Sequence, residues 1–230
     1  MVNLHDEKRL VRSATSWVEI APRSKLRDQQ GYERWLKRPM DLVLAVCLLV
    51  VLSPLLILVW VCVPLMLGPG GVVFRQQRVG RDGVPFTIYK FRSMLMDRRR
   101  TFQGSYSGRE RRGTHKSASD PRHTDFGRLL RAFSLDELPQ LINVIKGDMS
   151  LVGPRPELLA VAEEQGYVDH PRIMVRPGLT GLFQVSPLRS TSRISAGLHL
   201  DVLYVSRVTF RGDMKIILRT MAALLVRRGS

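Results

Sequence analysis

The sequence predicts an α+β fold that is mostly helical, with a membrane-inserted segment, amphipathic helices at the membrane surface and a small cytosolic domain with short strands. Three observations lead to this prediction. An uncharged run from Leu42 to Leu67 is long enough, at about 26 residues, to reach across a bilayer. Residues 72–96 alternate in polarity around Gly80 and Gly83, which predicts two short strands and a turn. Helical spacing of apolar residues recurs over 125–146, 156–168 and 201–226.

Composition narrows the class of protein. The chain has 230 residues, of which 44% are hydrophobic, so it is large enough for one packed domain and too apolar for a disordered tail. Its net charge of +16 favours an anionic partner such as nucleic acid, a phosphorylated substrate or an acidic lipid surface. The two cysteines, Cys47 and Cys62, lie in the apolar run, where we expect packing rather than a disulfide or zinc. The histidines show no metal-ligand spacing, and the polar N-terminus gives no sign of a cleaved signal peptide.

Changes in composition divide the chain into three parts. Residues 1–36 form a polar N-terminal arm, residues 37–70 the membrane segment, and residues 71–230 a cytosolic and interfacial domain. Within that domain, residues 97–123 predict a mobile basic loop, which either lies on anionic head groups or is solvated. We expect 176–200 to be irregular and GDMSLVGPRP to form a turn. The apolar C-terminal segment MKIILRTMAALLV suits the membrane surface and the core equally well.

Two details favour a re-entrant hairpin over a single spanning helix for the apolar run. Pro54 cannot donate a hydrogen bond to the carbonyl of Val50, so we expect a break there, with the Ser53 hydroxyl satisfying the freed carbonyl. Basic residues flank the run on both sides, and both flanks can be cytoplasmic only if the chain enters and leaves on the same side. These flanking residues are Arg34, Lys37, Arg38, Arg75, Arg78 and Arg81. We expect Asp41, at the start of the run, to anchor it by pairing with Arg38 or another cation.

The segment from Ser134 to Pro156, SLDELPQLINVIKGDMSLVGPRP, carries the clearest chemical signal. The adjacent carboxylates Asp136 and Glu137 precede Pro139 and an apolar periodic run, so we expect Asp136 to be the N-cap of a helix whose third residue is Pro139. Such a helix end favours anions such as phosphate. On spacing alone, the two residues can be a cap and a solvated acid. Alternatively, one carboxylate attacks phosphorus and the other holds a divalent cation.

Motifs from about residue 37 to 222 resemble, in the same order, those of the bacterial polyprenyl-phosphate phosphoglycosyl transferases, the monotopic sugar transferase family. The combination of SLDELPQL with KGDMSLVGPRP is highly specific. The other matching segments are KRPMD, SP, QRVG, FTIYKFRSM, GRLLR, PGLTG, DVLYV and DMKI, at residues 37–41, 53–54, 77–80, 86–94, 127–131, 177–181, 201–205 and 213–216.

The resemblance implies an enzyme that uses a UDP-sugar and a polyprenyl phosphate, in bacteria usually undecaprenyl phosphate. Asp136 would attack the β-phosphate and release UMP, and the phospho-sugar would then pass from Asp136 to the lipid phosphate. Glu137 would bind Mg²⁺ in the same scheme. The enzyme would be monotopic in the bacterial inner membrane, with its catalytic domain on the cytoplasmic face. Its product would start an exopolysaccharide, capsule, O-antigen or other glycan.

Four cations are candidates for binding the phosphates of the two substrates, since arginine offers a planar fork and lysine a point charge. They are Lys90, Arg92, Arg131 and Arg155. Without the resemblance, each is equally well a solvated, helix-end or turn residue. A second tier of carboxylates is able to support the metal or to orient an arginine, although such residues more often form caps and turns. This tier consists of Asp148, Asp201 and Asp213.

Two other classes of protein compete with the enzyme. A basic nucleic-acid-binding protein would explain the net charge, but the apolar run and the lack of a recognisable nucleic-acid module argue against it. A non-catalytic membrane anchor with the same fold would not need the acidic pair and its cations. From Val185 to Leu198 the chain departs from the family pattern, so the sugar and the glycan pathway are not predicted. The sequence is compatible with a homo-oligomer.

Overall fold

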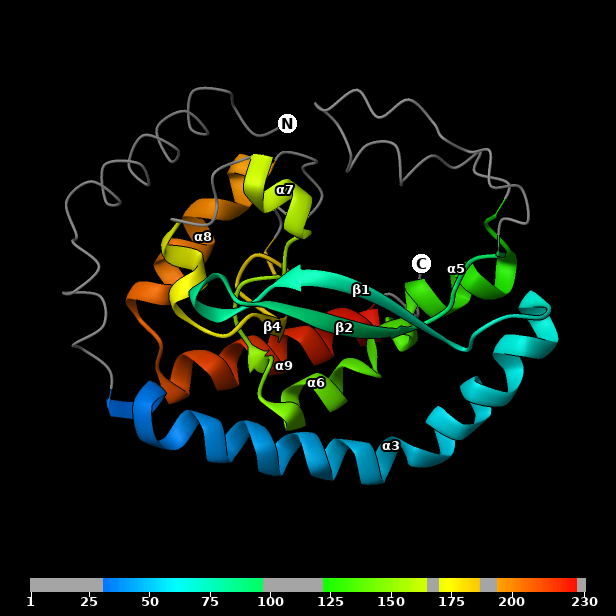
Figure 1. The fold of residues 1–230 in the computed structure, drawn as a ribbon. Coiled ribbons are helices and arrows are strands. Elements are labelled where there is room, and N and C mark those ends of the chain that lie inside the picture. Colours follow the sequence, from blue (N-terminus) through cyan, green and yellow to red (C-terminus); the bar gives the residue numbers. More distant parts are fainter. Residues whose placement is uncertain (1–30, 97–121, 165–169, 187–193, 227–230) are drawn as a thin grey trace.

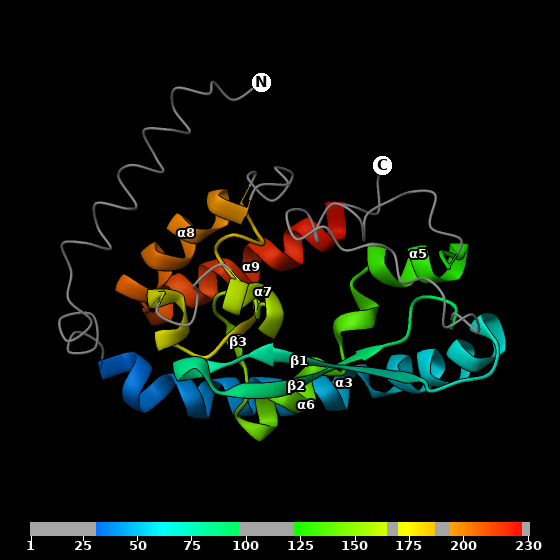
Figure 2. The same ribbon diagram turned by 45° about the horizontal axis from the view of Figure 1, so that its top comes forward.

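The computed structural model describes residues 31–96, 122–164, 170–186 and 194–226. A long helix, α3 (Lys37–Leu67), lies along one edge of the molecule, next to a two-stranded hairpin (Figure 1). Helices α7 (Leu159–Glu164) and α8 (Ile194–Ser206) lie near the turn of that hairpin, and α5 (Asp125–Ala132) lies near its open end (Figure 2). The arm at 1–30 and most of the predicted basic loop, 97–121, fall outside the described residues.

The hairpin confirms the strands predicted over residues 72–96. Strand β1 (Val73–Val79) pairs antiparallel with β2 (Pro85–Phe91), with Val73 opposite Phe91. Gly83 in the turn has φ 81°, a conformation that a residue without a Cβ adopts at little cost. Residues Phe86 and Ile88 of β2 point into the main core.

The helical pattern over 125–146 is divided into three elements rather than one or two long helices. Helix α5 is followed by a 3-10 turn, Leu135–Glu137, and by α6 (Gln140–Lys146). Helix α7 falls inside the range predicted for a helix at 156–168.

Two short strands were not expected. Strand β3 (Ser150–Val152) lies in the segment predicted as a turn, and it pairs in parallel with β4 (Gly178–Thr180) from the segment predicted as irregular. Three residues are too few to show an alternating pattern. The predicted helix pair near the C-terminus is α8, which begins earlier than expected, and α9 (Phe210–Val226).

Helix α3 continues without interruption through both Pro54 and Pro64. The predicted break at Ser53-Pro54 is therefore not confirmed, although the helix bends along its length (Figure 1). The Ser53 hydroxyl donates to the Val50 carbonyl at 2.8 Å, which is the carbonyl that Pro54 leaves without its helical donor. This hydrogen bond satisfies the freed carbonyl within the helix and so removes one reason for the helix to end.

The start of α3 is anchored by buried charges. Lys37 Nζ lies 2.6 Å from Asp213 Oδ2 on α9, and the Ser150 hydroxyl donates to Asp41 Oδ2 at 2.7 Å. The predicted anchoring role of Asp41 is confirmed, with Lys37 at 3.8 Å as its cation. Arg38 instead donates to the carbonyls at the C-terminal end of α6.

The far end of α3 packs on the same body, while its middle leaves apolar side chains exposed. Val63 and Leu67 are buried against Phe91 and Leu130. Among the described residues, the helical segment 32–67 is the one long and apolar enough to cross a membrane. Exposed side chains along it include Val43, Val46, Val50, Val51, Leu58 and Val61. Cys62 is half-buried and Cys47 exposed, and both are free.

Helix α9, which contains the apolar C-terminal segment, has one buried face and one exposed face. Ile216 is buried in the main core, and Ile217 packs against it. Leu218 and Met221 on the same helix are more than half exposed. One face of α9 is therefore core, and another is free for a membrane surface.

Candidate active site

The two adjacent carboxylates lie in the 3-10 turn that precedes α6. The prediction that Asp136 caps a helix is wrong, because α6 begins at Gln140 with Pro139 at its cap position. Pro139 has no N–H to give to the carbonyl of Leu135, so an α-helical bond cannot form there. The N–H of Leu138 takes that carbonyl instead, at 3.3 Å, and the turn tightens to the 3-10 form.

Ser134 turns the chain from α5 into this 3-10 turn. Its φ of 55° is uncommon for a residue other than glycine, and it carries no side-chain cap bond to the turn. Left-handed residues of this kind cost roughly 1–3 kcal/mol, and they cluster at functional sites. The backbone is thus bent sharply just before the carboxylates.

Glu137 is held by two cations from different parts of the chain. Lys90 Nζ on β2 lies 2.7 Å from Glu137 Oε1, and Arg155 Nη2 lies 3.1 Å from the same oxygen. Burial alone would raise the pKa of Glu137, but Arg155 and Lys90 lower it to about 2. Glu137 is therefore a permanent anion at physiological pH.

Asp136 has a different environment. Its side chain is buried, and among the described contacts it shares no ion pair with Lys90 or Arg155. Burial and the charge of Glu137 raise the pKa of Asp136 to about 6, against the opposing charges of Lys90, Arg155 and Arg131. Two neighbouring carboxylates with pKa values pushed apart in this way commonly perform different chemical roles.

Arg131 is close enough to Asp136 for its charge to lower the pKa of that carboxyl. Its Nη1 donates to the carbonyl of Ser93 at 2.7 Å and to the Ser93 hydroxyl at 3.3 Å. Three of the four predicted cations, Lys90, Arg131 and Arg155, therefore surround the carboxylate pair.

Arg92 is not brought to this site. It is buried, and its guanidinium donates to the carbonyls of Gly68 at 2.6 Å and Pro69 at 3.0 Å, just beyond the C-terminus of α3. Both terminal amines are thus used to bind the end of a helix, where unpaired carbonyls attract cations. Arg92 therefore lies apart from the acidic pair in this structure, and its role in binding phosphate stays a prediction.

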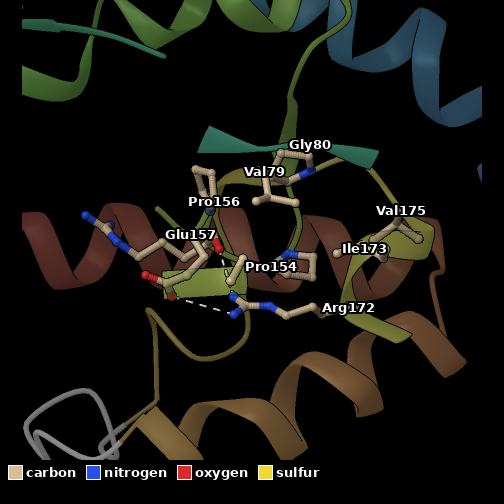
Figure 3. Close-up of a pocket in the computed structure, with 11 residues that line it drawn as sticks. Val79, Gly80, Pro154, Pro156, Glu157, Arg172, Ile173 and Val175 are labelled. Carbon is tan, nitrogen blue, oxygen red and sulfur yellow. Dashed lines mark hydrogen bonds and ion pairs between the residues drawn. The ribbon is translucent and has the colours of Figure 1, made fainter. Parts of the chain in front are cut away.

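The loop that carries Arg155 rests on a buried arginine that the sequence analysis missed. Arg172 Nη2 donates to the Arg155 carbonyl at 2.8 Å and lies 3.0 Å from Asp201 Oδ2. Its Nη1 lies 3.6 Å from Glu157 Oε2, and Figure 3 shows the two side chains pointing toward one another across a small pocket. Asp201 therefore orients an arginine, one of the two roles considered for it. Arg172 lies in a segment with no recognisable pattern, so little in the sequence pointed to it.

Asn143 is a second missed residue, and it fixes the carboxylate turn beside Lys90. It is fully buried in α6, where its Nδ2 donates to the Thr87 carbonyl at 2.7 Å and its Oδ1 accepts from the Tyr89 N–H at 3.1 Å. The amide thus takes the place of a neighbouring strand on the free edge of β2. One polar residue inside the apolar run LINVIK was the available signal, because a buried amide needs partners.

The other second-tier carboxylates have structural contacts. Asp148 Oδ2 accepts from Asn143 at 3.2 Å and lies 3.8 Å from Lys146. Asp213 accepts hydrogen bonds from Lys37 and from Tyr204, which lie at the anchor of α3. Neither contact set includes the acidic pair.

The arrangement is suited to an anionic reactant. A carboxylate without an ion pair can act as a nucleophile toward phosphorus, and surrounding cations stabilise the charge that builds up on phosphate oxygens. Within the described residues, no group of three or more His, Cys, Asp or Glu residues could hold a metal. A hard cation at Asp136 and Glu137 would therefore need oxygens from a substrate and from water, as Mg²⁺ sites often do.

Several known proteins are similar in sequence to this chain. The sequence model described as bacterial sugar transferase matches residues 32–227. The chain is 40% identical over 206 residues to a Salmonella typhimurium protein named undecaprenyl-phosphate galactose phosphotransferase. It is 38% identical over 201 residues to an Escherichia coli protein named UDP-glucose:undecaprenyl-phosphate glucose-1-phosphate transferase. It is also 37% identical over 199 residues to a Sinorhizobium fredii protein named exopolysaccharide production protein ExoY.

The alignments cover different shares of these relatives. They include 86% of this chain but 42% of the Salmonella protein, and 83% of this chain but 40% of the Escherichia coli protein. With the Sinorhizobium protein the coverage is 84% of this chain and 87% of the relative. The matched region contains all the site residues described above.

Proposed function

The chain belongs to the bacterial sugar transferase family, and on that premise we propose that it transfers a phospho-sugar from a UDP-sugar to a polyprenyl phosphate and releases UMP. The names of two relatives specify undecaprenyl phosphate, and one of them also specifies UDP-glucose. The observation that carries the proposal is the contrast within the acidic pair. Glu137 is locked as an anion by Lys90 and Arg155, whereas Asp136 beside it is buried and has a raised pKa.

In the first step, an Asp136 carboxylate oxygen attacks the β-phosphorus of the UDP-sugar. The bond from that phosphorus to the oxygen bridging the two phosphates breaks, and UMP leaves with the electron pair. Asp136 then carries the phospho-sugar as an acyl phosphate. Arg131 and Arg155 are suited to hold the phosphate oxygens, because arginine can donate two parallel hydrogen bonds to one phosphate.

In the second step, a phosphate oxygen of the polyprenyl phosphate attacks the same phosphorus. The bond between Asp136 and phosphorus breaks, so the carboxylate is restored and the product is a polyprenyl diphosphate-sugar. The sum of the two steps is UDP-sugar plus polyprenyl phosphate giving polyprenyl diphosphate-sugar plus UMP. Such a product would be the first membrane-bound intermediate in the assembly of an exopolysaccharide, capsule or O-antigen.

Mg²⁺ fits the donors that the structure provides. Lys90 and Arg155 both bind Oε1 of Glu137, so Oε2 of Glu137 would be the oxygen left to hold the metal, together with oxygens of the bound donor. The ion would neutralise charge on the diphosphate as UMP leaves. Lys90 and Arg155 would meanwhile keep Glu137 oriented and ionised.

We further propose that α3 enters the cytoplasmic leaflet of the inner membrane and returns to the same side. The segment before α3 and the segment after it meet, because Glu33 Oε1 lies 3.7 Å from Arg81 Nη1 in the hairpin turn. Strand β1 makes this return beside α3, so a spanning α3 would hold the polar residues of β1, such as Arg75, Gln76 and Gln77, inside the hydrocarbon core, where they are costly (Figure 1). The bend of α3 and its exposed apolar middle fit a shallow insertion (Figure 1).

Accessibility of single cysteines tests this topology. In a background lacking Cys47 and Cys62, Trp35→Cys and Val84→Cys place thiols at well-exposed positions before and after α3. A membrane-impermeant maleimide should label both thiols in inside-out vesicles and neither in intact spheroplasts. Val51→Cys, on the exposed middle of α3, is the matched control and should resist labelling from both sides. If the first two thiols react from opposite sides, α3 spans the membrane and the re-entrant proposal is wrong.

UMP release tests the proposed function itself. The protein in nanodiscs is incubated with Mg²⁺, polyprenyl phosphate and one of several UDP-sugars, and UMP is measured. With at least one donor, the enzyme should release UMP over many turnovers only when the lipid is present. Chelation of the metal should stop this release. A correctly folded preparation that releases no UMP from any donor would favour a non-catalytic membrane anchor.

A further inference from the structure

An apolar groove with a volume of about 510 Å³ lies between α3 and the hairpin. Leu49, Leu56 and Trp60 of α3 form one wall, and Trp60 packs edge-on against Phe91 of β2 with ring centroids 6.5 Å apart. Ile142 from α6 forms part of the opposite wall. A concave apolar surface of this size suits a hydrocarbon ligand better than a nucleotide or a sugar.

The groove and the acidic pair are built from the same two segments. Tyr89 and Phe91, which line the groove, flank Lys90, which binds Glu137. Pro139, a further lining residue, follows Glu137 by two positions. Side chains alternate along a strand, so the groove and the carboxylates lie on the two faces of β2. The groove comes nearest to the carboxylates along the chain at Pro139, so a ligand in it would reach them around the edge of β2 where α6 lies.

Two cations lie beside this apolar surface. Arg75 lines the groove, and its guanidinium carbon is 5.9 Å from the centre of the Tyr89 ring. Lys146 Nζ is 5.3 Å from the same ring centre and donates to the Tyr89 hydroxyl at 3.3 Å. The groove thus combines hydrocarbon walls with positive charge next to one side chain, which complements a lipid that carries a phosphate.

We propose that this groove binds the first isoprene units of the polyprenyl phosphate acceptor. The inference rests on the proposed function and extends it by naming the surface that selects the lipid. Four of the groove residues are on α3, whose exposed face is apolar, so a lipid reaches the groove sideways from the bilayer. They are Leu49, Leu56, Ile57 and Trp60. An ordinary phospholipid offers similar hydrocarbon, but its phosphodiester is not the terminal phosphate that the second step requires as a nucleophile.

Photocrosslinking tests the occupant directly. A polyprenyl phosphate with a diazirine on an isoprene unit near the phosphate is irradiated with the full chain in nanodiscs, and labelled peptides are identified by mass spectrometry. We expect label on the peptides containing Ile142 and Trp60, removed by excess unlabelled polyprenyl phosphate. A diazirine phospholipid in the same nanodiscs should label the exposed middle of α3 around Val51. Groove label that comes from the phospholipid, or that polyprenyl phosphate does not compete away, would overturn the proposal.

A bulky substitution in the groove tests its effect on catalysis. Ile142→Trp adds volume at a side chain that is 45% exposed, and Val51→Trp is the matched control on the outer face of α3. We expect Ile142→Trp to raise the acceptor KM about tenfold, equivalent to about 1.4 kcal/mol, and Val51→Trp to leave it within twofold. The exchange of labelled UMP into UDP-sugar without lipid reports the donor step alone. If this exchange falls as much as acceptor turnover does, or if the acceptor KM does not change, the groove does not bind the acceptor. Absence of exchange in the unsubstituted protein would instead contradict the proposed function.

Discussion

Asp136→Asn is expected to abolish UMP release, with a fall in kcat of at least about 10³-fold, because an amide does not form the acyl phosphate. The change is nearly isosteric, and Asp136 shares no ion pair with Lys90 or Arg155 among the described contacts. The folded structure should therefore survive the substitution. The rate is measured as UMP release with both substrates saturating, and the folded fraction by thermal unfolding.

Asp125→Asn provides the matched control for this experiment. Asp125 is a carboxylate in the first turn of α5, 96% exposed, and its partner Arg128 is also exposed. Removing its charge should leave turnover within about twofold of the unsubstituted rate, since exposed ion pairs contribute little to the stability of the fold. Turnover of Asp136→Asn close to the unsubstituted rate would assign the nucleophile to another group.

The second large effect concerns stability. Lys37→Met and Asp213→Asn should each lower the free energy of unfolding by about 3 kcal/mol or more, because each breaks a buried ion pair by removing one of its two charges. The two side chains are 7% and 0% exposed, and their charged atoms are 2.6 Å apart. For a chain of this size, the loss corresponds to a fall in Tm of roughly 10 °C. The double substitution should lose less than the sum of the two, because each single substitution already breaks the same ion pair.

The exposed pair Arg128 and Asp125 again serves as the control. Their side chains are 58% and 96% exposed at a separation of 2.6 Å, so the distance matches the buried pair while the burial differs. Arg128→Met should change the free energy of unfolding by about 1 kcal/mol at most. If the two substitutions in the buried pair are additive, and each costs no more free energy of unfolding than Arg128→Met, the anchor at the start of α3 does not stabilise the fold.

Local patterns in the sequence predicted the elements that form through interactions between residues close together in the chain. Alternation and two glycines were enough for the hairpin over 72–96. The acidic pair and the cations Lys90 and Arg155 were predicted as one site only through the resemblance, because the two cations lie 47 and 18 positions from Glu137 along the chain. The structure brings these side chains within hydrogen-bonding distance.

The structure departs from the other expectations where tertiary contacts, and in one case a nearby proline, overrode the local preference that the pattern indicated. Arg92 shares the basic character of Lys90 two residues earlier, but the end of α3 lies within its reach and uses its donors. Asp136 was expected at a helix cap, but the missing N–H of Pro139 shortens the helix and produces a 3-10 turn. Arg172 and Asn143 were missed because the partners of a buried polar residue are not visible from its neighbours in the sequence.

The covalent step is the centre of the proposed mechanism, and trapping it tests the account most directly. The protein is incubated with radiolabelled UDP-sugar and Mg²⁺ without lipid, quenched with acid, digested and analysed by mass spectrometry. We expect one phospho-sugar adduct, attached to the carboxyl group of Asp136 in the peptide that contains this residue. Polyprenyl phosphate added before the quench should remove the adduct. A preparation that turns over with lipid, but in which no adduct forms on Asp136 without it, would contradict the proposed mechanism.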